Sequence, residues 1–116
     1  MKIVRVQYAA KAEYAEKNKE NISKVMDELR ILNNPGIKYS VFVLDDGKTF
    51  MHLAIFENDH AENIHNVLES FKHFTSELQA NGLETKPTVE NLSLVGSSYD
   101  ILNQIITTDF KSLKEF

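Results

Sequence analysis

Arg5, Gln7 and His52 are the polar side chains of this sequence that best combine the chemistry of a small-molecule site. An arginine can hold a carboxylate or enolate oxygen, and a histidine can take or give a proton near neutral pH. A glutamine can orient a substrate carbonyl or dioxygen. If the strands that carry them are neighbours in one sheet, all three lie on one face, with Tyr39 one strand further out. We therefore predict His52 and Arg5 as catalytic, and Gln7, Tyr39 and Phe50 as substrate-binding.

The protonation state of His52 follows from this placement. An apolar wall disfavours the charged imidazolium, and a nearby Arg5 disfavours it again through like-charge repulsion, so both lower the pKa of His52. A neutral imidazole could act as a base toward a phenol. The same polar cluster also has a structural interpretation, as a buried hydrogen-bonded network at an interface between two copies of the chain.

A second set of chemistry-bearing residues, His65, Glu69 and His73, has the i, i+4, i+8 spacing of one side of a helix. That side lies away from the apolar stripe of the same segment, so we expect these side chains to face solvent and to hold no metal. The chain has no cysteine, which excludes disulfides, thiolate catalysis and Cys-ligated zinc or iron–sulfur clusters. It also lacks the glycine patterns of nucleotide sites, and no cofactor is expected.

The elements that must position these residues include a hairpin over residues 36–56, where two β-rich runs flank Asp46 and Gly47. An Asp-Gly pair tolerates the positive φ angles of a two-residue turn, which fixes the register. The predicted pairs are Val43 with Phe50, Val41 with His52 and Tyr39 with Ala54. Both faces are apolar. We expect one face to pack on the protein's own helices (Phe42, Leu44, Met51, Leu53, Ile55) and the other to need a different cover (Tyr39, Val41, Val43, Phe50, His52, Ala54, Phe56).

Periodicity predicts the remaining elements. Residues 2–9 alternate as a strand, and residues 11–32 have helical spacing until the sequence Asn33-Asn34-Pro35-Gly36 ends the helix. Asn58 or Asp59 offers an N-cap to a second helix that runs to Asn81-Gly82. Residues 88–97 alternate again as a strand, and residues 100–115 predict a final helix.

The element order is therefore β-α-β-β-α-β, the ferredoxin-like arrangement of an α+β protein with an antiparallel sheet. We assign residues 1–99 to one ferredoxin-like domain and residues 100–116 to a C-terminal helical extension of it. At 116 residues the chain has no room for a second domain. Since the uncovered sheet face would be larger than the apolar patch of a typical monomer, we expect a homodimer in which two sheets pack face to face as a barrel.

This arrangement resembles the dimeric α/β barrel superfamily, and within it the small single-domain proteins grouped with the antibiotic-biosynthesis monooxygenases. The resemblance covers roughly residues 2–99 and rests on the element order, the hairpin YSVFVLDDGKTFMHLAIFE, the FKHF of the second helix and the closing LVGSSY. It implies a pocket between sheet and helices, and oxygenation of phenolic or anthrone-like substrates without metal or flavin. The alternatives are a non-enzymatic stress-related or ligand-sensing dimer and an isomerase of the muconolactone type.

Composition limits the partners. The 13 basic residues are dispersed among 17 acidic ones, and the net charge of −4 argues against nucleic acid. No apolar run approaches the ~20 residues that span a bilayer, and the first residues interleave polar and apolar side chains, unlike a signal peptide. We expect a cytoplasmic protein whose partners are a second copy of itself and a small, aromatic ligand.

Overall fold

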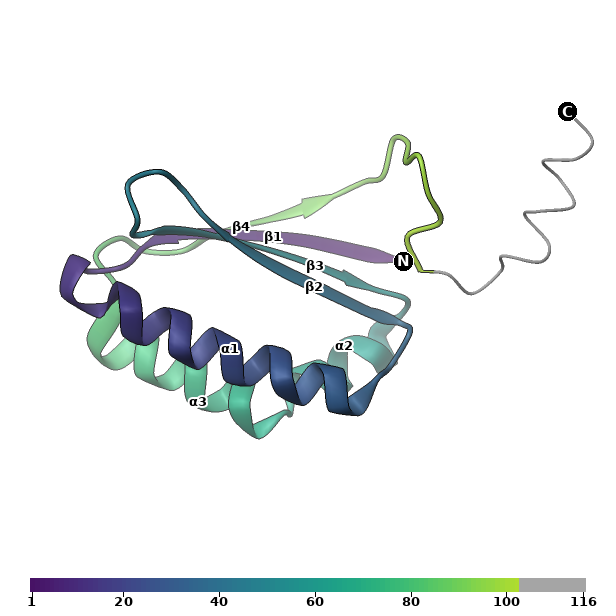
Figure 1. Ribbon diagram of the computed structural model, residues 1–116. Coiled ribbons are helices and arrows are strands. Elements are labelled where there is room, and N and C mark those ends of the chain that lie inside the picture. The colour runs from purple at the N-terminus through teal and green to yellow at the C-terminus, as the bar shows by residue number, and fades with distance from the viewer. Residues whose placement is uncertain (103–116) are drawn as a thin grey trace, which may run out of the picture.

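The computed structural model describes residues 1–102, and the predicted helix over residues 100–115 falls almost wholly outside them. In this part of the chain the helices cover one side of a sheet (Figure 1). The elements are β1 (Lys2–Ala9), the 3-10 turn η1 (Ala12–Tyr14), α1 (Ala15–Leu32), β2 (Ile37–Val43), β3 (Thr49–Phe56), α2 (Asp59–Asn66), α3 (Glu69–Glu77), the π-helical turn η2 (Leu78–Gly82) and β4 (Thr88–Leu92).

The sheet has the strand order β2-β3-β1-β4 with antiparallel pairing throughout. This is the ferredoxin-like sheet, so the predicted α+β fold is confirmed. β4 is shorter than the alternation over residues 88–97 predicted. Its last pair joins Leu92 to Ile3, and β1 begins at Lys2, so no strand remains for the following residues to pair with.

The hairpin has the predicted register, with Val43 opposite Phe50, Val41 opposite His52 and Tyr39 opposite Ala54. Its turn differs from the predicted two-residue form. Gly47 has a φ of 75°, but Asp46 does not adopt a positive φ. Its carboxylate instead accepts hydrogen bonds from the backbone N–H groups of Lys48 at 3.0 Å and Thr49 at 2.8 Å, so the side chain stabilises a longer turn.

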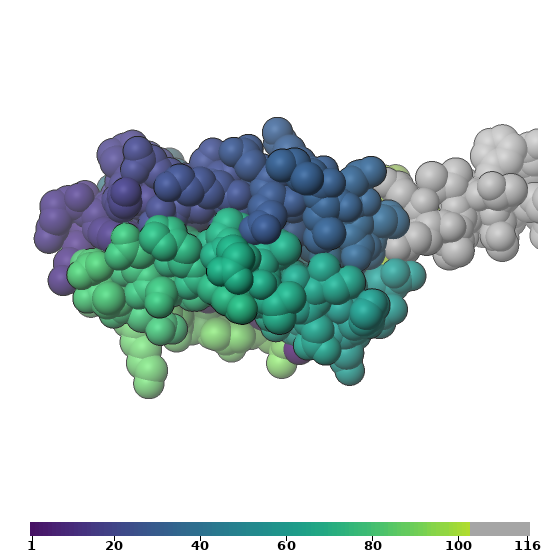
Figure 2. Space-filling view, turned by 90° about the horizontal axis from the view of Figure 1, so that it is seen from below, coloured from purple at the N-terminus to yellow at the C-terminus, as the bar shows by residue number. Residues whose placement is uncertain are grey.

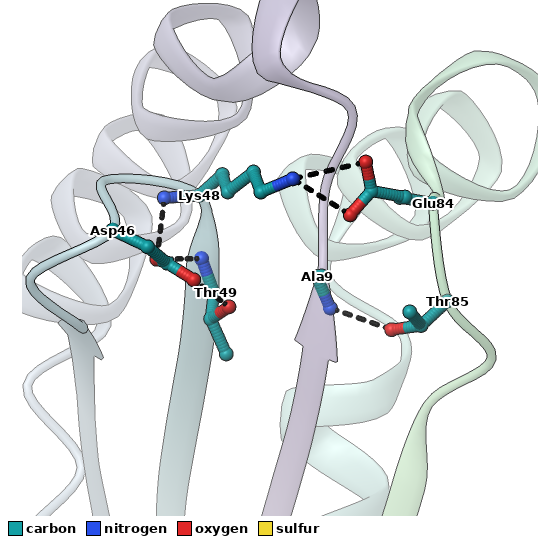
Figure 3. A network of polar contacts seen from close by, with 6 residues as sticks. All are labelled: Ala9, Asp46, Lys48, Thr49, Glu84 and Thr85. Carbon is teal, nitrogen blue, oxygen red and sulfur yellow. Dashed lines mark hydrogen bonds and ion pairs between the residues drawn. The ribbon is translucent and has the colours of Figure 1, made fainter.

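Polar contacts tie this turn to the segment after η2 (Figure 3). Lys48 Nζ lies 2.9 and 3.0 Å from the two carboxylate oxygens of Glu84, and the backbone N–H of Ala9 donates to Thr85 Oγ1 at 2.8 Å. The ion pair is partly exposed and adds little to stability by itself. Together the contacts fix the path of residues 83–87 beside the end of β1.

The predicted second helix is divided at Val67 and Leu68. Asn58 caps its start, as expected, by accepting a hydrogen bond from Ala61 N at 2.9 Å. Leu68 then takes an extended conformation, with φ −62° and ψ 134°, which ends α2 and starts α3. Glu28 of α1 accepts from the backbone N–H of Ser70 at 3.1 Å and from its hydroxyl. A carboxylate at the new helix N-terminus is favourable, so α1 stabilises the break.

The two faces of the hairpin are reversed relative to the sequence prediction. Cross-strand partners share a face, and Val6 pairs with His52, so the helices cover the side that carries Val6, Tyr8, Tyr39, Val41, Phe50, His52 and Phe56. The face of Phe42, Met51, Leu53 and Ile55, expected under the helices, is the one that no helix of residues 1–102 covers. Hydrophobic alternation could not decide between the faces because both are apolar.

Over the covered face, α1 lies beside a row formed by α2 and α3, as the view from that side shows by their colours (Figure 2). On the opposite face Phe42 is 52% exposed, while Met51, Leu53 and Ile55 are half-buried. Residues 93–101 lie along one end of this face, next to Ile3. None of the helices in residues 1–102 is both long and apolar enough to cross a membrane.

Gly82 tests the packing of η2 against η1. A methyl group at Gly82 would collide with the ring of Tyr14, which is buried, so Gly82→Ala should lower the free energy of unfolding by about 1–3 kcal/mol. Gly96→Ala is the matched control, since no atom of residues 1–102 lies within 4 Å of the added carbon. Urea denaturation of both variants measures the difference, and equal midpoints would contradict the close contact.

Candidate functional site

His52 lies on the covered face of β3, between Tyr8 of β1 and Tyr39 of β2. The Tyr8 hydroxyl is 2.8 Å from His52 Nε2, and the Tyr39 hydroxyl is 2.8 Å from His52 Nδ1. Asn18 of α1 donates from Nδ2 to the Tyr8 hydroxyl at 2.9 Å. We call these four side chains the tyrosine–histidine network. It joins three neighbouring strands to α1 beneath the helices.

Burial keeps the network neutral at pH 7. His52 is 3% exposed, and this burial lowers its pKa to about 4, with a smaller contribution from the nearby His65. The direction agrees with the sequence prediction, although His65 takes the place of Arg5 as the second cause. Burial also raises the pKa of Tyr39 and of Tyr8 above the usual range, and the hydrogen bond from Asn18 opposes the effect at Tyr8.

A cavity of about 190 Å³ lies against this network, between the sheet and α3. Its walls are mostly apolar and come from the sheet (Val6, Tyr8, Tyr39, His52), from α3 and η2 (Phe71, Phe74, Thr75, Leu78, Gln79) and from the segment before β4 (Leu83, Pro87). None of these lining residues is charged in its ordinary state at pH 7. An apolar cavity with few polar groups is typical of a small-molecule site.

His52 does not present a free ring nitrogen to this cavity. Each nitrogen already has a tyrosine hydroxyl at 2.8 Å, and a neutral imidazole has one donor and one acceptor. A ligand would therefore meet a hydroxyl of Tyr8 or Tyr39 first, and His52 would act on it through that hydroxyl. The predicted role of His52 as a direct base changes to that of a residue that orients and polarises two phenols.

Sequence reasoning missed His65, which it placed on a solvent-facing side. His65 is 2% exposed and packs in an aromatic cage, with its ring centroid 4.3 Å from Phe71, 4.8 Å from Tyr39 and 5.5 Å from Phe56. Neither ring nitrogen has a hydrogen-bond partner among the described residues. Burial lowers the pKa of His65 to about 4. The break at Val67 changes the helical phase, so the spacing to the later apolar stripe could not reveal this burial.

Arg5 and Gln7 are not brought together with His52. They lie on the opposite face of β1, because Val6 between them is the partner of His52. Arg5 donates to Gln7 Oε1 at 2.6 Å and to Glu90 Oε1 of β4 at 2.8 Å. The prediction that Arg5 shares a site with His52 is therefore wrong. The error lies in the hairpin, whose two apolar faces were assigned the wrong way round, because Val6 and Tyr8 do lie under the helices and Arg5 and Gln7 on the other face.

Of the remaining residues that the sequence singled out, some lie where they were expected and others do not. Tyr39 lines the cavity, whereas Phe50 lies behind it, 2% exposed and stacked on Tyr8 with ring centroids 5.8 Å apart. Glu69 and His73 are exposed, as expected, but His65 points inward, so the i, i+4, i+8 set does not share one side. Residues 1–102 hold no group of three or more potential metal ligands.

No family model matches the sequence, and no curated protein matches it. Solved structures do share its fold. A crystal structure of an antibiotic biosynthesis monooxygenase is 20% identical, with a TM-score of 0.70 over 83% of this chain and 100% of that one. Rv0793 from Mycobacterium tuberculosis is 11% identical, with a TM-score of 0.70 over 84% of this chain and 98% of that one. A provisionally assigned antibiotic biosynthesis monooxygenase from Nitrosomonas europaea is 13% identical, with a TM-score of 0.70 over 83% of this chain and 100% of that one.

The two buried histidines predict acid sensitivity. Both have a pKa of about 4 in the folded protein against 6.5 in the unfolded chain, so between these values the unfolded state binds more protons. Stability is therefore full above about pH 6.5 and falls as the pH drops toward 4. Each histidine contributes on the order of 3 kcal/mol to this loss, at ~1.4 kcal/mol per pKa unit.

Urea denaturation at several pH values between about 4.5 and 7.5 checks this dependence. His65→Phe removes one titrating group and two buried nitrogens without partners, so it should flatten the pH profile and raise stability at pH 7 by about 1 kcal/mol. His60→Gln, at an exposed position of the same helix, is the control. A profile that His65→Phe leaves as steep as that of the wild type would contradict the assignment.

Proposed function

We propose that this protein binds a small aromatic molecule of one ring in the cavity between its sheet and α3. The observation that carries the proposal is the cavity of about 190 Å³ in contact with Tyr39 and His52. Tight packing at His52 would have favoured a purely structural role. An apolar cavity of ~150 Å³ is known to hold benzene, so this volume suits a single ring.

The walls fit such a ligand chemically. Phe71 and Phe74 of α3 offer aromatic surfaces, and the apolar side chains around them favour an uncharged ring. A carboxylate buried here would lose its hydration with no cation among the lining residues to replace it. The hydroxyls of Tyr8 and Tyr39 supply the few polar contacts that orient a bound ring.

Cofactor-free monooxygenation of a quinol is a second candidate, favoured by the names of the fold neighbours. In that reaction one atom of dioxygen enters the ring and the other leaves as water with two hydrogens of the quinol, so the substrate supplies every electron. The first step removes a proton from a phenol, through Tyr39 or Tyr8 to His52. The lowered pKa of His52 makes it a weak base toward a phenol, so binding is the function that the site supports better.

A homodimer is the assembly that we propose, through the sheet face that no helix of the described residues covers. The sequence predicted that an apolar sheet face would be covered by a second copy of the chain. In the structure this argument applies to the open face, where Phe42, Met51, Leu53 and Ile55 contribute apolar surface. A two-fold interface must be complementary to itself. The ion pair of Arg5 and Glu90, 2.8 Å apart on the same face, supplies both charge signs to each copy. Such a dimer should bury more than ~1,000 Å² in total.

Ligand binding is tested by titrating benzaldehyde and a simple quinol into the protein and following backbone amide shifts by NMR. Shifts should concentrate at residues around the cavity. Val6→Phe extends a larger side chain from the cavity wall and should weaken binding by at least about 10-fold, the equivalent of ~1.4 kcal/mol.

Val95→Phe is the matched control for this experiment, since Val95 is fully exposed and does not line the cavity. Equal binding by wild type and Val6→Phe would contradict the site, and no binding by the wild type would contradict the function. Oxygen uptake with release of a hydroxyquinone from the quinol, lost in Val6→Phe, would add turnover to binding.

The assembly is tested by light scattering at micromolar concentration. The wild type should have the mass of a dimer. Leu53→Asp places a charge at the centre of the open face and should give a monomer that keeps its fold. Asn63→Asp, at an exposed position of α2, should remain dimeric. A monomeric wild type, or a dimer that withstands Leu53→Asp, would show that this face is not the interface.

A further inference from the structure

We infer that the ligand of this cavity is neutral and carries a carbonyl-type oxygen, which accepts a hydrogen bond from the Tyr39 hydroxyl; the inference rests on the proposed function. It follows from counting protons in the tyrosine–histidine network. The network contains three hydrogen bonds: Asn18 to Tyr8, Tyr8 with His52, and His52 with Tyr39.

One proton remains after these bonds are made. Neutral His52 has one N–H, and each tyrosine has one O–H, which gives three protons apart from those of Asn18. The two bonds at the imidazole use two of them, one donated by the ring and one donated to it. With the Asn18 amide oriented as it is here, Nδ2 toward Tyr8 and Oδ1 buried without a partner among residues 1–102, both tautomers of His52 leave one tyrosine hydroxyl with its proton and no acceptor among these residues.

The tautomer of His52 decides which tyrosine this is. With the proton on Nδ1, the bonds run in one direction, from Asn18 through Tyr8 and His52 to Tyr39, and Tyr39 keeps the free proton. With the proton on Nε2, Tyr8 must accept two bonds while Tyr39 donates to the ring. Hydrogen bonds that run in one direction strengthen one another, so the first arrangement is favoured. Tyr8 is then fully satisfied.

Tyr39, which keeps the free proton, lines the cavity, and its hydroxyl lies beside His52, another lining residue. The other walls of the cavity are mostly apolar, so water there has few other partners to bind. A buried donor without a partner costs free energy, and a ligand acceptor recovers it. The ring stacks on His65 with centroids 4.8 Å apart and packs edge-on to His52, which holds the hydroxyl in place. Aromatic aldehydes, ketones and quinones present a suitable oxygen on one ring.

The test compares two ligands of nearly the same shape, benzaldehyde and styrene, in which a vinyl group replaces the aldehyde. Relative to Tyr39→Phe, the wild type should prefer benzaldehyde by about 5-fold, the effect of one neutral hydrogen bond. Tyr8→Phe should keep this preference, because His52 can still donate to Tyr39. Tyr99→Phe, at an exposed position away from the cavity, is the control for the substitution itself.

The outcomes separate the inference from the proposed function. If both ligands bind but Tyr39→Phe leaves their ratio unchanged, the inference is overturned and the binding function stands. If the preference disappears in Tyr8→Phe and persists in Tyr39→Phe, the assignment of Tyr39 is overturned. If neither ligand binds the wild type, the proposed function fails and the inference fails with it.

A measurement on the wild type alone keeps the inference testable if Tyr39→Phe does not fold. The nitrogen chemical shifts of His52, recorded by NMR at pH 7 on protein labelled at histidine, distinguish the two tautomers. We expect the proton on Nδ1, donated to Tyr39. A proton on Nε2 would make Tyr8 the free donor and would overturn the assignment.

Discussion

The pairing of β1 with β3 is the constraint on which the rest of the structure depends, because it sets Val6 opposite His52. Cross-strand partners share a face, so this one register places Tyr8 and His52 under the helices and Arg5 in the open. The hairpin register then adds Tyr39 on the far side of His52. A shift of one residue in β1 would exchange its two faces and separate Tyr8 from the imidazole.

The break between α2 and α3 completes the site from the helical side. Extended Leu68 resets the helical phase, so that His65 before the break and Phe71 after it face the same interior, with ring centroids 4.3 Å apart. Glu28 of α1 stabilises the new helix start through Ser70. α1 therefore supports the site twice, through this contact and through the hydrogen bond from Asn18 to Tyr8.

Two buried neutral imidazoles give this core an unusual chemical character. Burial lowers the pKa of both His52 and His65 to about 4, which makes them weak bases but good partners for neutral groups. A polar network in an apolar surrounding costs free energy unless all its members have partners. In the tyrosine–histidine network one tyrosine proton and Asn18 Oδ1 have no partner among residues 1–102, and the cavity beside Tyr39 is where a ligand can bind.

The sequence by itself determined the elements and much of their arrangement: the hairpin register, the Asn58 cap and the ferredoxin-like order all follow from local periodicity and turn chemistry. It also singled out His52 and Tyr39, which the structure places in contact at the cavity. Tertiary structure alone decided which face of the hairpin the helices cover. Both faces are apolar, so the alternation of side chains cannot distinguish the covered face from the open one. It likewise decided the burial of His65, since no glycine or proline marks the break at Val67 and Leu68 and the contact with Glu28 comes from a distant helix.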